Sequence, residues 1–151
     1  MAEASKTTRR RRLGHAVIEV SLMAPWIFFL FVGVFDMGFY AVALICTQNA
    51  ARAAVAYTAS SQATSADAIG ACGYALTELN AMPNVRSLGS CNAAPLTVTA
   101  TYLSQGVDQA PASQVTVAYQ TPNLIPMPVP GLAAQFTITR TAQQRVKSAL
   151  P

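Results

Sequence analysis

The feature that most constrains this chain is a long apolar run near its start. Residues 16–45 hold two formal charges, Glu19 and Asp36, and are rich in Phe, Leu, Val, Ile and Met. A helix of about 30 residues is about 45 Å long, whereas the hydrocarbon core of a bilayer is about 30 Å thick. A buried core helix of this kind would need a large surrounding domain, and the rest of the chain is too short and too polar. The sequence therefore predicts one membrane-spanning helix.

The basic residues predict how that helix is oriented. Four consecutive arginines precede the run: Arg9, Arg10, Arg11 and Arg12. Basic residues beside a spanning helix are retained in the cytoplasm, so we expect a cytoplasmic N-terminus and an exported C-terminal part. Residues 1–14 carry five bases and one acid, which accounts for the whole net charge of +4, and residues 15–151 carry five of each. The arginine cluster therefore indicates topology and contact with anionic lipid, and we expect no nucleic-acid partner.

The helix is expected to continue beyond the apolar run. Residues 50–56 are nearly all alanine, which favours helix and permits close packing between helices. We therefore expect one helix over about residues 16–59, half of it in lipid. The chain then divides into a basic cytoplasmic leader (1–14), the transmembrane part of the helix (15–45), its exported part (46–60) and a small exported domain (61–151).

The exported domain is predicted to be α+β. Apolar residues recur at helical spacing between residues 65 and 80, in a stripe expected to face the core: Ile69, Cys72, Leu76 and Leu79. Three segments then alternate at the strand period, over residues 96–102, 114–119 and 136–141. We expect an antiparallel sheet of about three strands on the outer half of the long helix. The proline-rich connection at residues 122–131 is either a surface crossover or an apolar contact for another subunit.

The three cysteines suggest one disulfide. Cys72 and Cys91 both lie in the part expected to be exported, where disulfides persist, and we expect them to pair rather than remain free thiols. Cys46 lies at the outer end of the long helix and is expected to be a free, buried thiol. An intermolecular bridge through Cys46 is the open alternative.

The residues that the chain lacks argue against an enzyme. It has one histidine, His15, no Cys-x-x-Cys pair and no glycine-rich phosphate loop. A metal site with several histidines is therefore excluded, and a Ser-His-Asp site would have to use His15 at the edge of the membrane. We expect no catalytic residue, metal or cofactor. A hydrolase that uses the carboxylates of Asp67, Glu78 or Asp108 is the remaining enzymatic alternative.

The N-terminal third resembles a known family. Residues 9–20 read Arg-Arg-Arg-Arg-Leu-Gly-His-Ala-Val-Ile-Glu-Val, which is similar to a type IV prepilin leader: a basic stretch that ends in glycine, then a glutamate at the fifth following position and an apolar helix. Pro25, the Asp-Met-Gly at 36–38 and the Thr-Gln-Asn-Ala-Ala-Arg at 47–52 more specifically resemble the TadE-like minor pseudopilins of the bacterial Tad (tight adherence) pilus system.

This resemblance implies a structural role. It implies that a prepilin peptidase cuts between Gly14 and His15, and that Glu19 then pairs with the new amine of a neighbouring subunit during assembly. The implied partners are that peptidase, other pilin or pseudopilin subunits, the pilus secretion machinery and the inner membrane, with a place at the cell surface if the subunit enters a pilus. The alternative is an uncleaved, single-pass anchored module for binding or adhesion.

Overall fold

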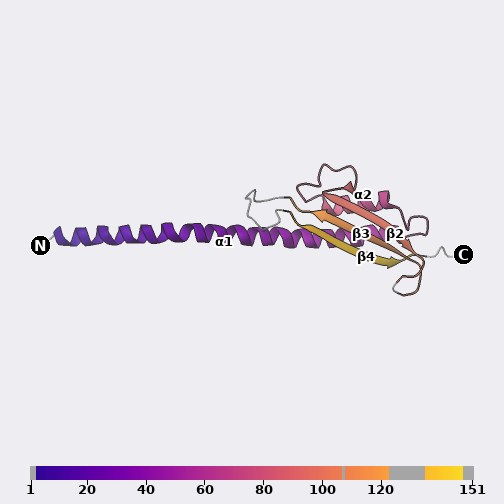
Figure 1. Ribbon diagram of the computed structural model, residues 1–151, viewed down its shortest axis with the longest axis horizontal. Coiled ribbons are helices and arrows are strands. Elements are labelled where there is room, and N and C mark those ends of the chain that lie inside the picture. Colours follow the sequence, from indigo (N-terminus) through magenta and orange to yellow (C-terminus); the bar gives the residue numbers. More distant parts are fainter. Residues whose placement is uncertain (1–2, 107, 123–134, 148–151) are drawn as a thin grey trace. The chain divides into compact units, whose positions relative to one another are not determined.

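The computed structural model describes residues 3–106, 108–122 and 135–147, and the side chains among them from residue 17 onward. Its elements are α1 (Glu3–Thr58), α2 (Ala68–Leu79), β1 (Asn92–Ala93), β2 (Leu96–Leu103), β3 (Ala112–Gln120) and β4 (Thr137–Arg145) (Figure 1). The chain forms two compact units, Met1–Phe39 and Tyr40–Pro151. We call the second unit the C-terminal domain.

Helix α1 has 56 residues and includes Pro25. It begins at Glu3, earlier than the expected start near residue 16, and it ends at Thr58 as expected. The earlier start has a simple local cause, because lysine and arginine are good helix formers and residues 3–15 contain no proline.

The sheet has four antiparallel strands in the order β1-β2-β3-β4. Strands β2, β3 and β4 are the three expected from the sequence, whereas the expected total of three is wrong by one. Strand β1 has two residues, Asn92 and Ala93, which pair with Thr97 and Leu96. A segment this short shows no alternation, so no periodic pattern marks it.

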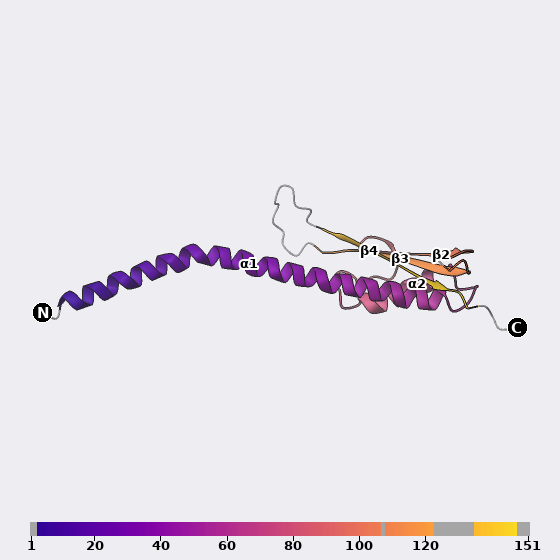
Figure 2. The ribbon, with the colours of Figure 1, turned by 90° about the horizontal axis from the view of Figure 1, so that it is seen from below.

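Alternation along the strands gives the sheet one apolar and one polar face. The buried residues of the inner face are Leu96, Val98, Val115, Val117, Tyr119 and Ile138. The part of α1 within the C-terminal domain and α2 both lie on this side of the sheet (Figure 2). The facing side of α1 is built of small residues with no exposed surface: Ala43, Thr47, Ala50, Ala51 and Ala54. Small side chains let the helix backbone approach the sheet, so larger residues of the strands fill the interface.

Helix α2 is confirmed, but its core-facing stripe differs from the predicted one. The buried residues are Ala71, Cys72, Ala75 and Leu79, whereas Ile69 is 87% exposed and Leu76 is half-buried. Because Ala71 and Ala75 are small, the side of α2 on which they lie packs against the core. The prediction that Ile69 is a core residue was wrong because the periodicity argument gave weight to large apolar residues and none to alanine.

Candidate functional site

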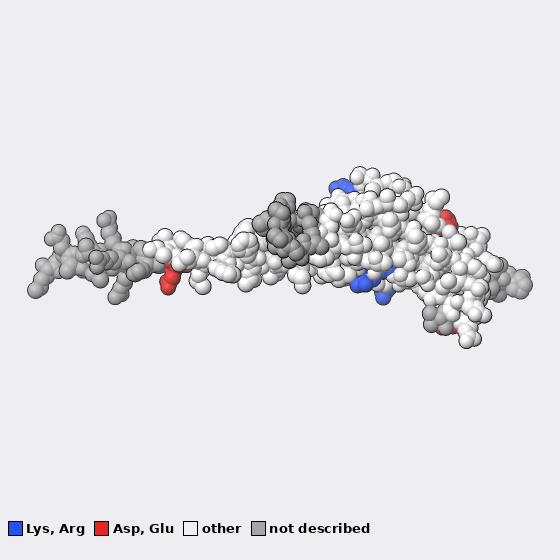
Figure 3. Space-filling view, viewed as in Figure 1, with Lys and Arg blue, Asp and Glu red and all other residues white. Residues whose placement is uncertain are grey.

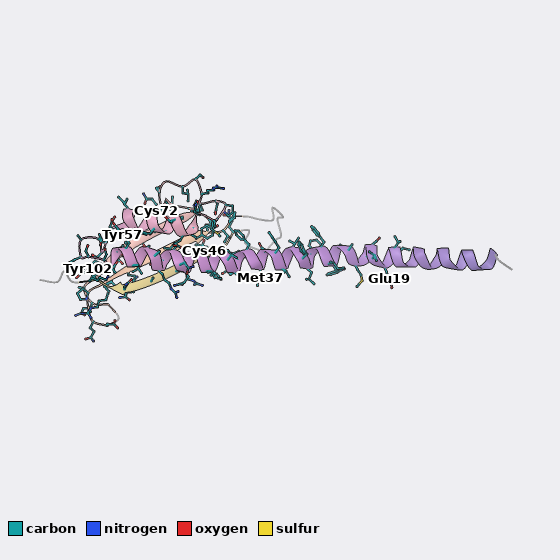
Figure 4. The ribbon with its side chains drawn as sticks, turned by 180° about the vertical axis from the view of Figure 1, so that it is seen from behind. Glu19, Met37, Cys46, Tyr57, Cys72 and Tyr102 are labelled. Atoms are coloured by element: carbon teal, nitrogen blue, oxygen red, sulfur yellow. A yellow bond between two sulfur atoms is a disulfide. The ribbon has the colours of Figure 1, made fainter. Side chains whose placement is uncertain are left out.

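The first candidate site is the apolar part of α1. Among the described residues, one helix is long and apolar enough to cross a membrane, with its candidate span at Val17–Thr58. Large apolar side chains cover its surface on all sides between Glu19 and Met37 (Figure 4), and Trp26, for example, is 78% exposed. A surface of this kind is unfavourable in water and favourable in lipid, so this segment is a candidate membrane anchor.

The residues expected to take part in processing and assembly all lie in α1. The backbones of Arg9, Arg10, Arg11, Arg12, Gly14 and His15 belong to this helix, and their side chains lie outside the described part. Glu19 is described, and its side chain is exposed. Asp36, 17 positions further along the same helix, is half-exposed.

The second candidate site is the C-terminal domain, where a disulfide connects two separate segments. Cys72 in α2 and Cys91, just before β1, are joined with their Cα atoms 5.7 Å apart. The predicted pairing is thus confirmed. The bond joins α2 to the edge of the sheet. The connection between α2 and β1, residues 80–91, contains no helix or strand. Cys46 is a free thiol and is half-buried.

A polar cluster joins the end of α1 to the start of α2. Asp67 is the N-cap of α2, and its Oδ1 accepts hydrogen bonds from the backbone N–H groups of Ile69 (3.1 Å) and Gly70 (3.0 Å). The hydroxyl of Tyr57 donates to Oδ2 of Asp67 (2.8 Å), and the Tyr57 ring stacks on Tyr74 with centroids 4.8 Å apart. No local pattern in the sequence indicates the contact between Asp67 and Tyr57.

Glycine is required at position 70 by this arrangement. A Cβ atom placed there would lie 2.3 Å from Cε1 of Tyr57 and 2.6 Å from Oδ2 of Asp67. Any side chain would therefore displace the tyrosine ring from the cap. The cluster fixes the angle at which α2 leaves α1, which is a structural role.

The cap also makes the stability of the domain depend on pH. The Gly70 N–H, then the Tyr57 hydroxyl and the Ile69 N–H, hold the pKa of Asp67 below its usual value. A carboxyl group whose pKa is lower in the folded chain stabilises the fold above its unfolded pKa of about 4, and this stabilisation is lost as pH falls through the folded pKa.

We expect Asp67→Asn, which still caps but does not titrate, to show a smaller fall in melting temperature than the wild-type chain between pH 6 and pH 2. Circular dichroism at both pH values measures this, and an equal fall in the two proteins would contradict it.

Buried polar groups in the C-terminal domain are satisfied within the fold. The Ser113 hydroxyl lies 2.7 Å from both the Thr58 hydroxyl and the Ser65 carbonyl, which connects β3 to α1 and to the loop after it. The hydroxyl of Tyr119 donates to Oδ1 of Asn84 (2.7 Å), and burial raises the pKa of Tyr119 to about 12. No buried side-chain polar atom in the described part lacks a partner. These groups therefore hold elements of the domain together.

Two of the carboxylates considered for catalysis lie at opposite ends of α2, and the third lies in a loop of the sheet. Asp67 caps α2, Glu78 is exposed near the other end of α2, and Asp108 lies in the loop between β2 and β3. Asp108 lines a small open pocket together with Gly106, Gln143 and Arg145. The described residues contain no group of three or more His, Cys, Asp or Glu side chains that could hold a metal ion.

Comparisons of the chain with protein-family models, curated proteins and solved structures found no match.

Proposed function

We propose that the chain is a membrane-anchored, pseudopilin-like structural subunit of a Tad or type IV-like pilus or of its assembly machinery. In this proposal a prepilin peptidase cuts after Gly14, and the cytoplasmic membrane anchors the subunit through α1. The N-terminus lies in the cytoplasm and the C-terminal domain is exported. The subunit acts by assembly with other pilin or pseudopilin subunits and catalyses no reaction.

One observation supports this proposal above the others. A single helix, α1, supplies an exposed apolar stretch and then, without interruption, the small-residue face that packs against the sheet. A simple anchor needs a spanning segment and a linker, whereas here the helix itself is part of the core of the domain. The disulfide between Cys72 and Cys91 is compatible with an oxidising compartment.

Glu19 has a specific role in the proposal. It is an exposed carboxylate near the start of the candidate span, and the cost of an acid in lipid rises with depth, to about 2.5–3.5 kcal/mol or more at the centre of a bilayer. The amine that cleavage creates at His15 would offset this cost if it came from a neighbouring subunit, because an ion pair in low dielectric is strong when both partners are present.

Cleavage can be tested directly. In cells with an active prepilin peptidase, we expect the mature protein to begin at His15, and we expect Gly14→Phe to abolish cleavage because a bulky side chain prevents close approach of the backbone to the protease. Leu13→Phe, which exchanges one bulky residue for another beside the same bond, is the matched control and should still be cut. N-terminal mass spectrometry of membrane fractions measures the outcome.

The results separate the proposal from its main alternative. A wild-type chain that keeps residues 1–14 would instead favour an uncleaved, anchored module for binding or adhesion, and normal cutting of Gly14→Phe would remove the site assignment.

In the same assay Glu19→Ala should still insert into the membrane and be cut, but it should assemble poorly. Unchanged assembly of Glu19→Ala would contradict the proposed ion pair.

A further inference from the structure

Strand β4 leaves one long edge of the sheet open. Its nine residues pair with β3 on one side, in a register that continues without a bulge from Thr137 to Arg145. At the opposite side of the sheet, β1 and the Cys91 carbonyl, which accepts from the Val98 N–H, cover part of β2. Within the described residues, no strand lies beside the outer edge of β4.

The hydrogen-bond pattern shows which backbone groups face this edge. The N–H groups of Thr121 and Val146 donate to the carbonyls of Phe136 and Pro111, so the even-numbered residues of β4 exchange hydrogen bonds with β3. The odd-numbered residues therefore direct their N–H and C=O groups away from β3: Thr137, Thr139, Thr141, Gln143 and Arg145. Lys147 is also odd-numbered, so its N–H points away from β3. This N–H donates to the Ala59 carbonyl at the end of α1 (3.0 Å).

Few of these outward groups have a partner in the described part of the chain. One described contact reaches this row, a 3.4 Å hydrogen bond from the guanidinium of Arg140 to the Thr139 carbonyl. A strand edge of this length is normally protected by proline, by a bulge or by charge, and β4 contains neither proline nor a bulge. Its protection is charge alone.

That charge is of one sign along the strand. Arg140 and Arg145 lie in β4, and Lys147 follows it. Arg52 is exposed and lies two helical turns before Ala59, on the side of α1 whose end bonds to Lys147. Figure 3 shows Lys and Arg atoms gathered along the margin of the domain where β4 runs. Asp108, which lines a pocket with Arg145, is the acid near the far end of the strand.

This charge selects between the two kinds of strand that could add to the edge. A second copy of β4 would add its own two arginines to the same edge, and in the register that sets Arg140 opposite Arg140 these like charges are destabilising. An acidic strand would be attracted by the same arginines while its backbone satisfied the outward N–H and C=O groups.

We propose that the open edge of β4 docks an extended acidic segment of a partner protein, which adds to the four-stranded sheet as a further antiparallel or parallel strand. Backbone hydrogen bonds to the odd-numbered residues hold the segment, and Arg52, Arg140 and Lys147 make the edge prefer acidic sequences over basic ones.

The test uses the full chain in nanodiscs of zwitterionic lipid, so that anionic lipid does not compete for the bases. The probes are two labelled peptides as long as β4, nine residues, one alternating Thr and Glu and the other alternating Thr and Lys. Fluorescence anisotropy should give a Kd for the Glu peptide at least about tenfold lower than for the Lys peptide, with the difference reduced by salt.

Two variants test the backbone and the charge separately. Thr141→Pro removes an outward N–H without removing a backbone hydrogen bond to β3, and it should weaken binding of the Glu peptide about tenfold. Thr141→Ala is the matched control, because both variants lose the 2.9 Å hydrogen bond between the Thr116 and Thr141 hydroxyls, and it should bind within about threefold of the wild-type chain. The double variant Arg52→Glu with Arg140→Glu keeps the outward N–H groups and should reverse the preference between the peptides.

Four results would overturn the proposal. The first is no binding of the Glu peptide, and the second is equal binding of both peptides. The third is a dimer of the full chain that forms without peptide and disappears in Thr141→Pro, because the occupant of the edge would then be a second copy. A Glu peptide that binds Thr141→Pro as tightly as Thr141→Ala would likewise exclude the β4 edge.

Discussion

Removal of the Cys72–Cys91 disulfide, by Cys72→Ala with Cys91→Ala, is expected to lower the free energy of unfolding of the C-terminal domain by about 3 kcal/mol. The bond closes a loop with a sequence separation of 19, and it joins α2 to the segment that leads into β1 and β2. Without it, the unfolded chain gains the freedom of that loop, whereas the folded chain keeps its other contacts. Hydrogen exchange of the β3 amides measures the change, because these amides lie in the middle of the sheet.

Cys46→Ala is the control for this prediction. Cys46 is a free thiol on α1, so its removal should leave the exchange of the β3 amides nearly unchanged. If the double variant exchanged as slowly as the wild-type chain, the bond would make no contribution to stability.

A larger residue on the small-residue face of α1 is expected to have a comparable effect. Ala50 has no exposed surface and faces the sheet, so Ala50→Leu would force the helix and the strands apart and should lower the free energy of unfolding by about 1–3 kcal/mol. Ala56 lies on the same helix and is exposed, and Ala56→Leu should change that free energy by about 0.5 kcal/mol or less. Hydrogen exchange of the β3 amides again provides the measurement. Similar effects of the two substitutions would show that the helix face is not tightly packed.

Sequence patterns predicted the elements with strong periodicity. The apolar run predicted the candidate membrane segment, and alternation over many residues predicted β2, β3 and β4 close to their observed positions. The pair Cys72–Cys91 was also accessible, because three cysteines allow a small number of possible pairings.

The remaining features depend on contacts between distant residues. The two residues of β1 are held by pairing with β2 and by the nearby disulfide, and neither leaves a pattern in a segment of that length. The exposure of Ile69 follows from Ala71 and Ala75, which determine how α2 meets the core. The stacking of Tyr57 on Tyr74 joins residues of two different helices, so no local pattern marks it.

The site residues divide in the same way. Gly14 and Glu19 were singled out by their spacing and by the apolar helix that follows, and they remain the basis of the proposed processing and assembly. The open edge of β4 was not foreseen, because an edge is defined by the order of strands in the sheet. The predicted strand at residues 136–141 also stopped short of Gln143 and Arg145, which belong to that edge.

The alignment of β4 with α1 has a mechanical consequence. Within the C-terminal domain, Tyr40 stacks edge-on against Phe136, with centroids 6.0 Å apart, and the Ala59 carbonyl bonds to the Lys147 N–H. The two elements therefore run side by side in the same direction over their shared length. A tensile load applied along this part of α1 would act on these two contacts in shear, so that they slip together instead of separating one after the other.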